Sequence, residues 1–125
     1  MIFGIGIDIV ENQRIMKAYS KWGERFLKRV FSPDELKFIL ERPDPIPPMA
    51  IRFAAKEAFS KALKTGLKKG VYLKDIAMLH HPSGEPYLKL SGNAKDLMIK
   101  MGIKAVHVSA SHEKSFSVAT VILEV

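Results

Sequence analysis

The amino-acid sequence predicts an α+β domain in which a mainly antiparallel sheet packs against one long helix. Three observations predict this class: residues 2–10 alternate as a strand does, residues 49–65 form the longest helical pattern, and residues 106–125 are typical of a hairpin. A chain of 125 residues is long enough to bury one hydrophobic core. We therefore expect residues 1–125 to form a single domain.

The first predicted strand places a carboxylate beside two glycines. A period of two puts Gly4, Gly6 and Asp8 on one face. Because glycine leaves that face without side chains, another backbone or a ligand can come close to it. Two interpretations of Asp8 stay open: it caps the turn that follows the strand, or it binds a ligand.

Residues 12–31 predict a helix that starts at Asn12 as the N-cap. Apolar residues recur at helical spacing and should face the core; they are Ile15, Tyr19, Trp22, Phe26 and Val30. Gly23 is the point at which this helix could break into two pieces.

The same segment carries a row of positive charges. Five cations follow one another at spacings of 3, 4, 4 and 3 along one side of the helix; they are Arg14, Lys17, Lys21, Arg25 and Lys28. Only Glu24 intervenes, so the row is either a solvated face or a docking surface for an acidic partner. The net charge of +7 suits nucleic acid, an anionic membrane surface, a phosphorylated small molecule or an acidic protein.

The middle of the chain predicts two helices joined by a proline-rich connection. Residues 32–35, Ser-Pro-Asp-Glu, form a capping box that starts a helix ending before Pro43. Residues 43–48 should be an extended loop, because each proline disfavours helix in the residue before it. The long helix then spans residues 49–65 and ends at Gly66.

The remainder predicts strands around one short helix. Residues 68–70 are expected to be loop, and residues 76–80 and 87–90 are expected to be strands joined by a turn at 82–86. Ser91 or Asn93 caps a short helix that reaches Met101. Residues 106–111 and 116–125 form the final hairpin around a polar turn at 112–115.

The long helix contains the candidate chemistry. Glu57 and Lys61 are four residues apart on one face, which fits an ordinary surface ion pair or one side of a binding site. If Asp8 and Glu57 meet, their oxygens suit Mg²⁺, which keeps waters and takes other ligands from substrate phosphates. Lys61 and Arg52 could then bind those phosphates.

Three histidines have weaker signals. His112 follows small residues with two hydroxyls and is either a turn histidine or part of a phosphate cradle. His80 and His81 are adjacent on a strand, so they should point to opposite faces, which argues against a shared metal. The sequence has no cysteine, no leader pattern and no run long enough to cross a bilayer, and these features predict a cytoplasmic protein without membrane insertion.

Three stretches together resemble a known family. GIGIDIVENQRI, RFAAKEAFSKAL and VHVSASHEKSFSVATVIL are similar to the holo-acyl-carrier-protein synthases, the short bacterial members of the 4'-phosphopantetheinyl transferase superfamily. The resemblance implies that superfamily's fold and its reaction in fatty acid biosynthesis. In that reaction 4'-phosphopantetheine moves from coenzyme A to a serine of apo acyl carrier protein, with Mg²⁺ required, and adenosine 3',5'-bisphosphate is released.

The resemblance also assigns roles to residues. Asp8 and Glu57 would be the Mg²⁺ ligands, with Lys61 on the coenzyme A phosphates. The further coenzyme A contacts would be Arg52, Ser111, His112 and the turn containing Gly84 and Pro86. The cations of the first helix would receive the carrier protein. Short family members are homotrimers with active sites at subunit interfaces, so Asp8 and Glu57 could come from different chains.

The proton acceptor, position 64 and the function itself each have an alternative. Either Glu57 or a metal-bound water would take the serine proton. Lys64 departs from the family, which often has glycine there. A small nucleic-acid-binding module is the alternative function, disfavoured because the aromatic residues of the first helix are expected in the core; an inactive structural subunit is a third.

Overall fold

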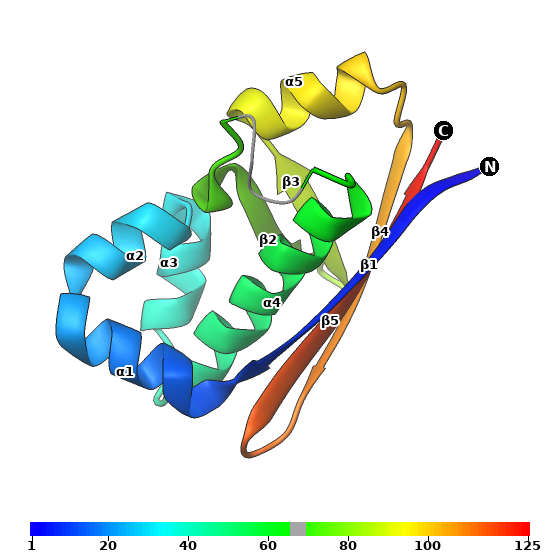
Figure 1. Ribbon diagram of the computed structural model, residues 1–125. Helices are drawn as coiled ribbons and strands as arrows, with labels where there is room; N and C mark the ends of the chain where they lie inside the picture. Colours follow the sequence, from blue (N-terminus) through cyan, green and yellow to red (C-terminus); the bar gives the residue numbers. More distant parts are fainter. Residues whose placement is uncertain (66–69) are drawn as a thin grey trace.

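The computed structural model describes residues 1–65 and 70–125. The elements in order are β1 (Ile2–Glu11), α1 (Asn12–Trp22), α2 (Glu24–Val30), α3 (Pro33–Leu40), α4 (Ile46–Ala62), a 3-10 turn η1 (Leu73–Asp75), β2 (Ile76–His80), β3 (Pro86–Leu90), α5 (Gly92–Lys100), β4 (Ala105–His112) and β5 (Phe116–Glu124) (Figure 1). The expected Gly66 helix end and the loop at Lys68 and Lys69 lie outside the described residues.

Within the described residues, the strands form two antiparallel sheets. One has the order β1-β5-β4, and the other is the hairpin β2-β3. All three strand pairings are antiparallel, and the helices gather on one side of the larger sheet (Figure 1). The predicted α+β class with a mainly antiparallel sheet is therefore confirmed.

Helix α4 packs directly on the inner face of β1. A Cβ atom added at Gly4 would collide with the carbonyl oxygen of Ala62, and one added at Gly6 would collide with that of Ala58. The glycine face is thus occupied by a helix backbone rather than left open for a ligand. This close approach brings Asp8, two residues further along β1, to the same helix.

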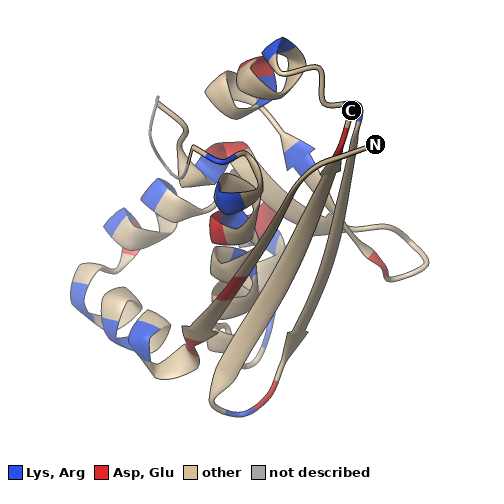
Figure 2. Cartoon of the chain, turned by 45° about the vertical axis from the view of Figure 1, so that its right-hand side comes forward, with Lys and Arg blue, Asp and Glu red and all other residues tan. Residues whose placement is uncertain are grey.

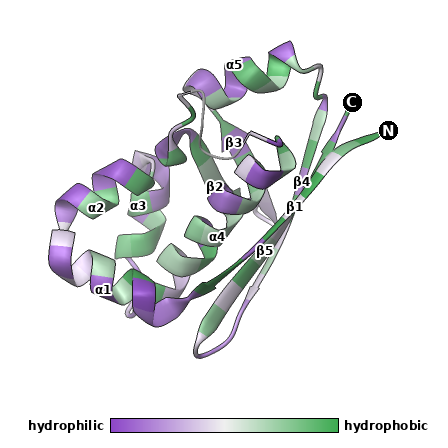
Figure 3. Ribbon diagram, in the orientation of Figure 1, coloured by the Kyte–Doolittle hydropathy of each residue, from purple (hydrophilic) through white to green (hydrophobic). Residues whose placement is uncertain are grey.

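The opposite face of the larger sheet is apolar and exposed. Ile5, Ile7 and Ile9 of β1 are each more than 60% exposed (61%, 61% and 64%). Their cross-strand partners on β5 include Ile122 and Val118, and Figure 3 shows hydrophobic colouring along both strands. An apolar sheet face of this kind is unusual for a monomer and indicates an interaction surface.

The start of α3 was predicted correctly, whereas the start of α4 was not. The capping box is present: Ser32 Oγ accepts from the Glu35 amide and Glu35 Oε1 accepts from the Ser32 amide. Helix α4, however, begins at Ile46, so the extended loop expected over 43–48 was wrong in its second half. Proline fits the first turn because those amides lack intrahelical acceptors, and the Asp44 carboxylate accepts from the Ile46 amide at 3.1 Å.

Helix α4 ends at Ala62, three residues earlier than expected. Lys64 then adopts a left-handed conformation with φ of 67°, which favours glycine. The short helix α5 begins at Gly92 with Ser91 in the N-cap position, while the side-chain Nδ2 of Asn93 donates to the carbonyl of Gly70.

The break at Gly23 is confirmed, and it changes two expectations. Gly23 has φ of 54° and separates α1 from α2, so Trp22 turns outward and is 49% exposed instead of lying in the core. Asn12 is also not the N-cap, since Glu11 takes that position. The buried Asn12 side chain instead binds the β4–β5 turn through the carbonyls of Glu113 and Lys114.

Candidate active site

The first cluster joins β1 to α4 and contains the predicted carboxylates. Lys61 Nζ lies 3.1 Å from Asp8 Oδ1 and 3.0 Å from the carbonyl oxygen of Ile7. Burial, then the negative charge of Asp8, raise the pKa of Glu57, while Lys61 and Arg14 act in the opposite sense. Asp8 and Glu57 thus lie together within one chain, and Asp8 is more than a turn cap.

The donor set of this cluster fits Mg²⁺. Two half-buried carboxylates lie close enough for their charges to repel, and a divalent cation would relieve that repulsion. Within residues 1–65 and 70–125, no group of three or more His, Asp and Glu side chains is placed to bind a metal. Mg²⁺ commonly binds through one or two carboxylates, with water and substrate phosphates as its other ligands.

The second cluster lines a cavity of about 410 Å³ on another side of α4. Arg52 and His112, both predicted as coenzyme A contacts, lie in it together with Arg42. The ring of Phe38 lies below two guanidinium groups, 4.0 Å from that of Arg42 and 4.5 Å from that of Arg52. Cations grouped around one concave space are suited to an anionic ligand.

Arg52 is the central residue of this cavity. Its side chain is buried, one of its Nη atoms donates to the carbonyl of Pro48 at 3.2 Å, and its Nε has no hydrogen-bond partner. Burial lowers its pKa to about 10, opposed by the charge of Glu35, so the group remains cationic at neutral pH. A buried guanidinium with an unpaired donor is costly unless an anion binds beside it.

The two clusters occupy different faces of one helix. Arg52 and Glu57 are five residues apart, which corresponds to about 140° around α4. One helix therefore presents the Glu57 carboxylate toward β1 and the Arg52 guanidinium toward α3 and β2.

The remaining predicted contacts lie on the two hairpins. Ser111 is exposed, and neighbouring strand positions place it on the opposite face of β4 from His112. It lies across from Val118 on the outer sheet face. Gly84, with φ of 101°, forms the β2–β3 turn, and Pro86 pairs with His80 across that hairpin.

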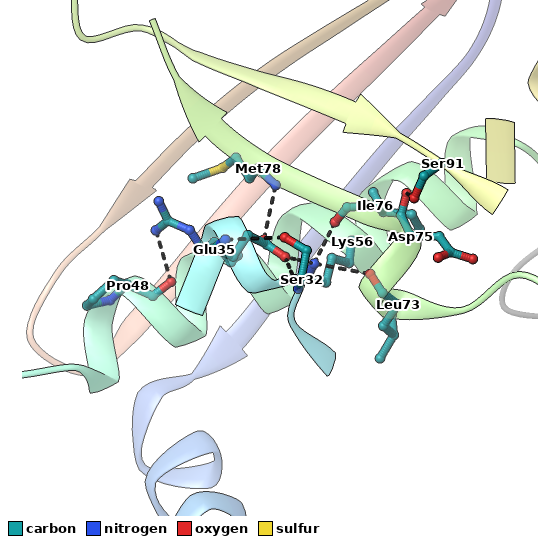
Figure 4. A network of polar contacts seen from close by, with 10 residues as sticks. Ser32, Glu35, Pro48, Lys56, Leu73, Asp75, Ile76, Met78 and Ser91 are labelled. Atoms are coloured by element: carbon teal, nitrogen blue, oxygen red, sulfur yellow. Dashed lines mark hydrogen bonds and ion pairs between the residues drawn. The ribbon is translucent and has the colours of Figure 1, made fainter. Parts of the chain in front are cut away.

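Sequence reasoning missed a buried ion pair next to the candidate site. Lys56 and Glu35 are both fully buried, with 2.6 Å between Nζ and Oε1. Lys56 also donates to the carbonyls of Leu73 and Ile76, and Glu35 Oε2 accepts from the Met78 amide (Figure 4). The signal available in the sequence was the capping box at Glu35, which predicted its local bonds but not its partner 21 residues away.

The basic surface lies over α1 and α2, where blue bands gather in Figure 2. All five predicted cations are exposed, but Gly23 divides them, so they do not follow one straight helix. Trp22 lies between Lys21 and Arg25, whose charged groups are 5.0 and 5.8 Å from its ring. The expectation that no aromatic residue is interleaved with the cations was therefore wrong, and it no longer counts against nucleic acid.

The fold and the two clusters define a protein suited to bind a phosphorylated ligand. A family model described as the 4'-phosphopantetheinyl transferase superfamily matches residues 4–121, and the chain belongs to that superfamily, which confirms the resemblance. A holo-[acyl-carrier-protein] synthase of Halothermothrix orenii is 48% identical over 99% of this chain and 98% of the relative.

Solved structures give the same result. The crystal structure of holo-[acyl-carrier-protein] synthase from Neisseria meningitidis matches with a TM-score of 0.92 and 38% identity, over 99% of each chain. The enzyme of Helicobacter pylori, solved in complex with coenzyme A, matches with a TM-score of 0.85 and 35% identity over 96% of this chain and 99% of that one. In the described part of this chain, no helix is long and apolar enough to cross a membrane.

Proposed function

We propose that this protein transfers 4'-phosphopantetheine from coenzyme A to a serine of apo acyl carrier protein, as a holo-acyl-carrier-protein synthase of fatty acid biosynthesis in the cytoplasm. The observation that carries the proposal is the meeting of Asp8, Glu57 and Lys61 between β1 and α4. The full-length similarity to named synthases supports it. Residues 1–125 would act as one transferase domain.

In the reaction, the serine Oγ forms a bond to the β-phosphorus of coenzyme A, and the bond from that phosphorus to the bridging oxygen breaks. Adenosine 3',5'-bisphosphate leaves with the electron pair. Mg²⁺, when bound by Asp8 and Glu57, would neutralise charge on the pyrophosphate. Lys61 can place its ammonium on a phosphate oxygen by leaving its contact with Asp8. Among the chain's own groups, Glu57 is the α4 carboxylate of this cluster that could accept the serine proton.

The cavity around Arg52 and His112 would receive another part of coenzyme A. Its cations and the unpaired Arg52 Nε favour a phosphate. The Gly84–Pro86 turn adjoins this cavity through the pairing of Pro86 with His80, which supports its assignment to the nucleotide end.

The exposed sheet face supports self-association, and the proposed assembly is a homotrimer. Ile5, Ile7 and Ile9 form an apolar strip that a second copy can cover. Ser111 belongs to the same outer face, so a Ser111 contact with coenzyme A requires the ligand to lie where two copies meet. Light scattering should give three times the chain mass of 14.0 kDa, and Ile7→Lys should lower that mass.

The carrier-protein surface would be the exposed cations of α1 and α2, since acyl carrier protein is acidic. Arg14 connects this surface to the first cluster, because its charge acts on Glu57. A serine presented beside Arg14 would thus lie close to the carboxylates.

The test is mass spectrometry of an apo acyl carrier protein incubated with this protein, Mg²⁺ and coenzyme A. A mass gain equal to phosphopantetheine is expected, with Asp8→Asn and Glu57→Gln at least about a hundredfold slower. Asp96→Asn on exposed α5 is the matched control and should act as the wild type. Salt-sensitive binding to nucleic acid, with no mass gain on the carrier, would instead favour the nucleic-acid alternative. The exposed Trp22 is the observation that favours this alternative.

A further inference from the structure

His80 lies at the cavity around Arg52, although sequence reasoning gave it no role. Its Nδ1 is 3.5 Å from an Nη atom of Arg52. Its ring centroid is 5.4 Å from that of Phe38, the ring that also lies beside Arg42 and Arg52. His80 is thus part of a group of nitrogen-bearing side chains arranged around one aromatic ring.

This group is short of negative charge. Arg42, Arg52, His80 and His112 line the cavity, and Asp44 is the carboxylate among its described lining residues. Arg52 is buried and its Nε lacks a partner. The unsatisfied donor and the excess of cations both indicate that the ligand of this cavity is an anion.

The ligand can be specified further from the chemistry of coenzyme A, and this step rests on the proposed function. Coenzyme A carries two anionic parts, a pyrophosphate and a 3'-phosphomonoester on the ribose. If the pyrophosphate lies at Asp8, Glu57 and Lys61, the 3'-phosphate is the anion left for the second cluster. The pairing of His80 with Pro86 places this histidine next to the turn assigned to the nucleotide.

We propose that His80 is a specificity-determining residue that donates a hydrogen bond, as an imidazolium, to the 3'-phosphate and so selects coenzyme A over dephospho-coenzyme A. In the free protein Arg52 is the donor and Nδ1 the acceptor of their contact, which corresponds to a neutral imidazole with its proton on Nε2. A phosphate dianion placed among Arg42, Arg52 and His80 offsets the two guanidinium charges that disfavour a protonated imidazole. The imidazole then takes up a proton.

This exchange makes the selection depend on pH. Burial, then the charges of Arg52 and Arg42, lower the pKa of free His80, and a bound dianion must raise it. Between those two values binding takes up a proton, so affinity for the 3'-phosphate falls as pH rises. The other titratable and charged groups facing His80 are His112 on β4, Arg42 and Asp44 between α3 and α4, and Arg52 on α4.

The first experiment compares kcat/KM for coenzyme A and dephospho-coenzyme A between pH 6.5 and 8.5. The wild type should prefer coenzyme A, and the preference should fall about fivefold as pH rises. His80→Asn should show a lower preference with a flatter pH profile. His81→Asn is the matched control, because His81 stacks on Tyr87 away from the cavity, with 4.2 Å between ring centroids.

The second experiment needs no carrier protein. Calorimetry without Mg²⁺ compares adenosine 3',5'-bisphosphate with adenosine 5'-monophosphate as probes. The wild type should bind the bisphosphate more tightly and take up a proton, measured as a buffer-dependent enthalpy, and His80→Asn should lose part of the proton uptake. The two proteins share every other titratable group, so the difference in proton uptake between them reports on His80.

The outcomes separate the two proposals. Transfer from coenzyme A with an equal substrate preference and pH profile in wild type and His80→Asn overturns the role of His80 and leaves the transferase intact. Absence of transfer by the wild type overturns the proposed function, while tighter bisphosphate binding that depends on His80 still supports the anion site. Equal binding of both probes by wild type and variant rejects the site.

Discussion

Gly6 of β1 lies so close to the carbonyl oxygen of Ala58 that the two backbones touch. A Cβ atom at position 6 would overlap that oxygen. The contact sets the distance between β1 and α4, and thereby the separation of Asp8 from Glu57 and Lys61.

Replacing Gly6 by alanine should therefore destabilise the fold by about 3 kcal/mol or more, because neither backbone can move without disturbing the core. Urea denaturation measures this. Gly102→Ala is the control that has a conformational cost without a steric clash. Gly102 has φ of 74° with open space around it, so its replacement should destabilise the fold by about 1 kcal/mol. Equal losses for the two variants would argue against the backbone contact.

Lys56→Met should cost about 3–5 kcal/mol, because it leaves the Glu35 carboxylate buried without its cation. Lys61→Met on the same helix is the control. Its side chain is 53% exposed and pairs with Asp8, so its loss should be below about 1 kcal/mol. The free energy of unfolding distinguishes them, and a small loss at Lys56 would contradict a buried ion pair.

Lys64→Gly should stabilise the protein by about 1 kcal/mol, since glycine adopts the left-handed conformation without steric cost. The Lys64 ammonium lies 4.6 Å from the Phe3 ring, and its loss offsets part of the gain. Lys64→Ala keeps the strain and removes this contact, so it should not stabilise. Thermal unfolding of the three proteins provides the measurement.

Arg25→Glu should raise the KM for acyl carrier protein about tenfold and leave the KM for coenzyme A nearly unchanged, because reversing an exposed charge slows association with an acidic partner. Lys95→Glu on α5 changes net charge equally and serves as the control. If both variants change the KM for the carrier equally, the effect belongs to net charge and not to the basic surface.

Chelation of Mg²⁺ should abolish transfer and leave the urea midpoint unchanged. Asp8 and Lys61 contact each other directly, so the metal is not required to join β1 to α4. Activity should return when Mg²⁺ is added back. A large shift of the urea midpoint on chelation would instead indicate a structural metal.

Much of this architecture could be predicted because its signals are local. The alternation of β1, the capping box at Ser32 and the break at Gly23 all depend on neighbours within a few residues. Asp8 and Glu57 could be joined only through the family resemblance, since periodicity gives the face of each residue and not which faces meet.

The features that were missed depend on tertiary contacts. Asn12 suits a cap by residue type, yet it binds a turn more than 100 residues away in the chain. Trp22 fits an apolar stripe that Gly23 interrupts. For His80, the sequence showed only that it points to the opposite strand face from His81. Its proposed role depends on Arg52 and Phe38, which come from two separate helices.

Because α4 presents its two clusters on different faces, its length between Arg52 and Glu57 cannot vary. Inserting or deleting one residue there would rotate one cluster about 100° relative to the other, and no local adjustment would restore both. Insertions and deletions in functional relatives are therefore expected to be excluded from the middle of this helix.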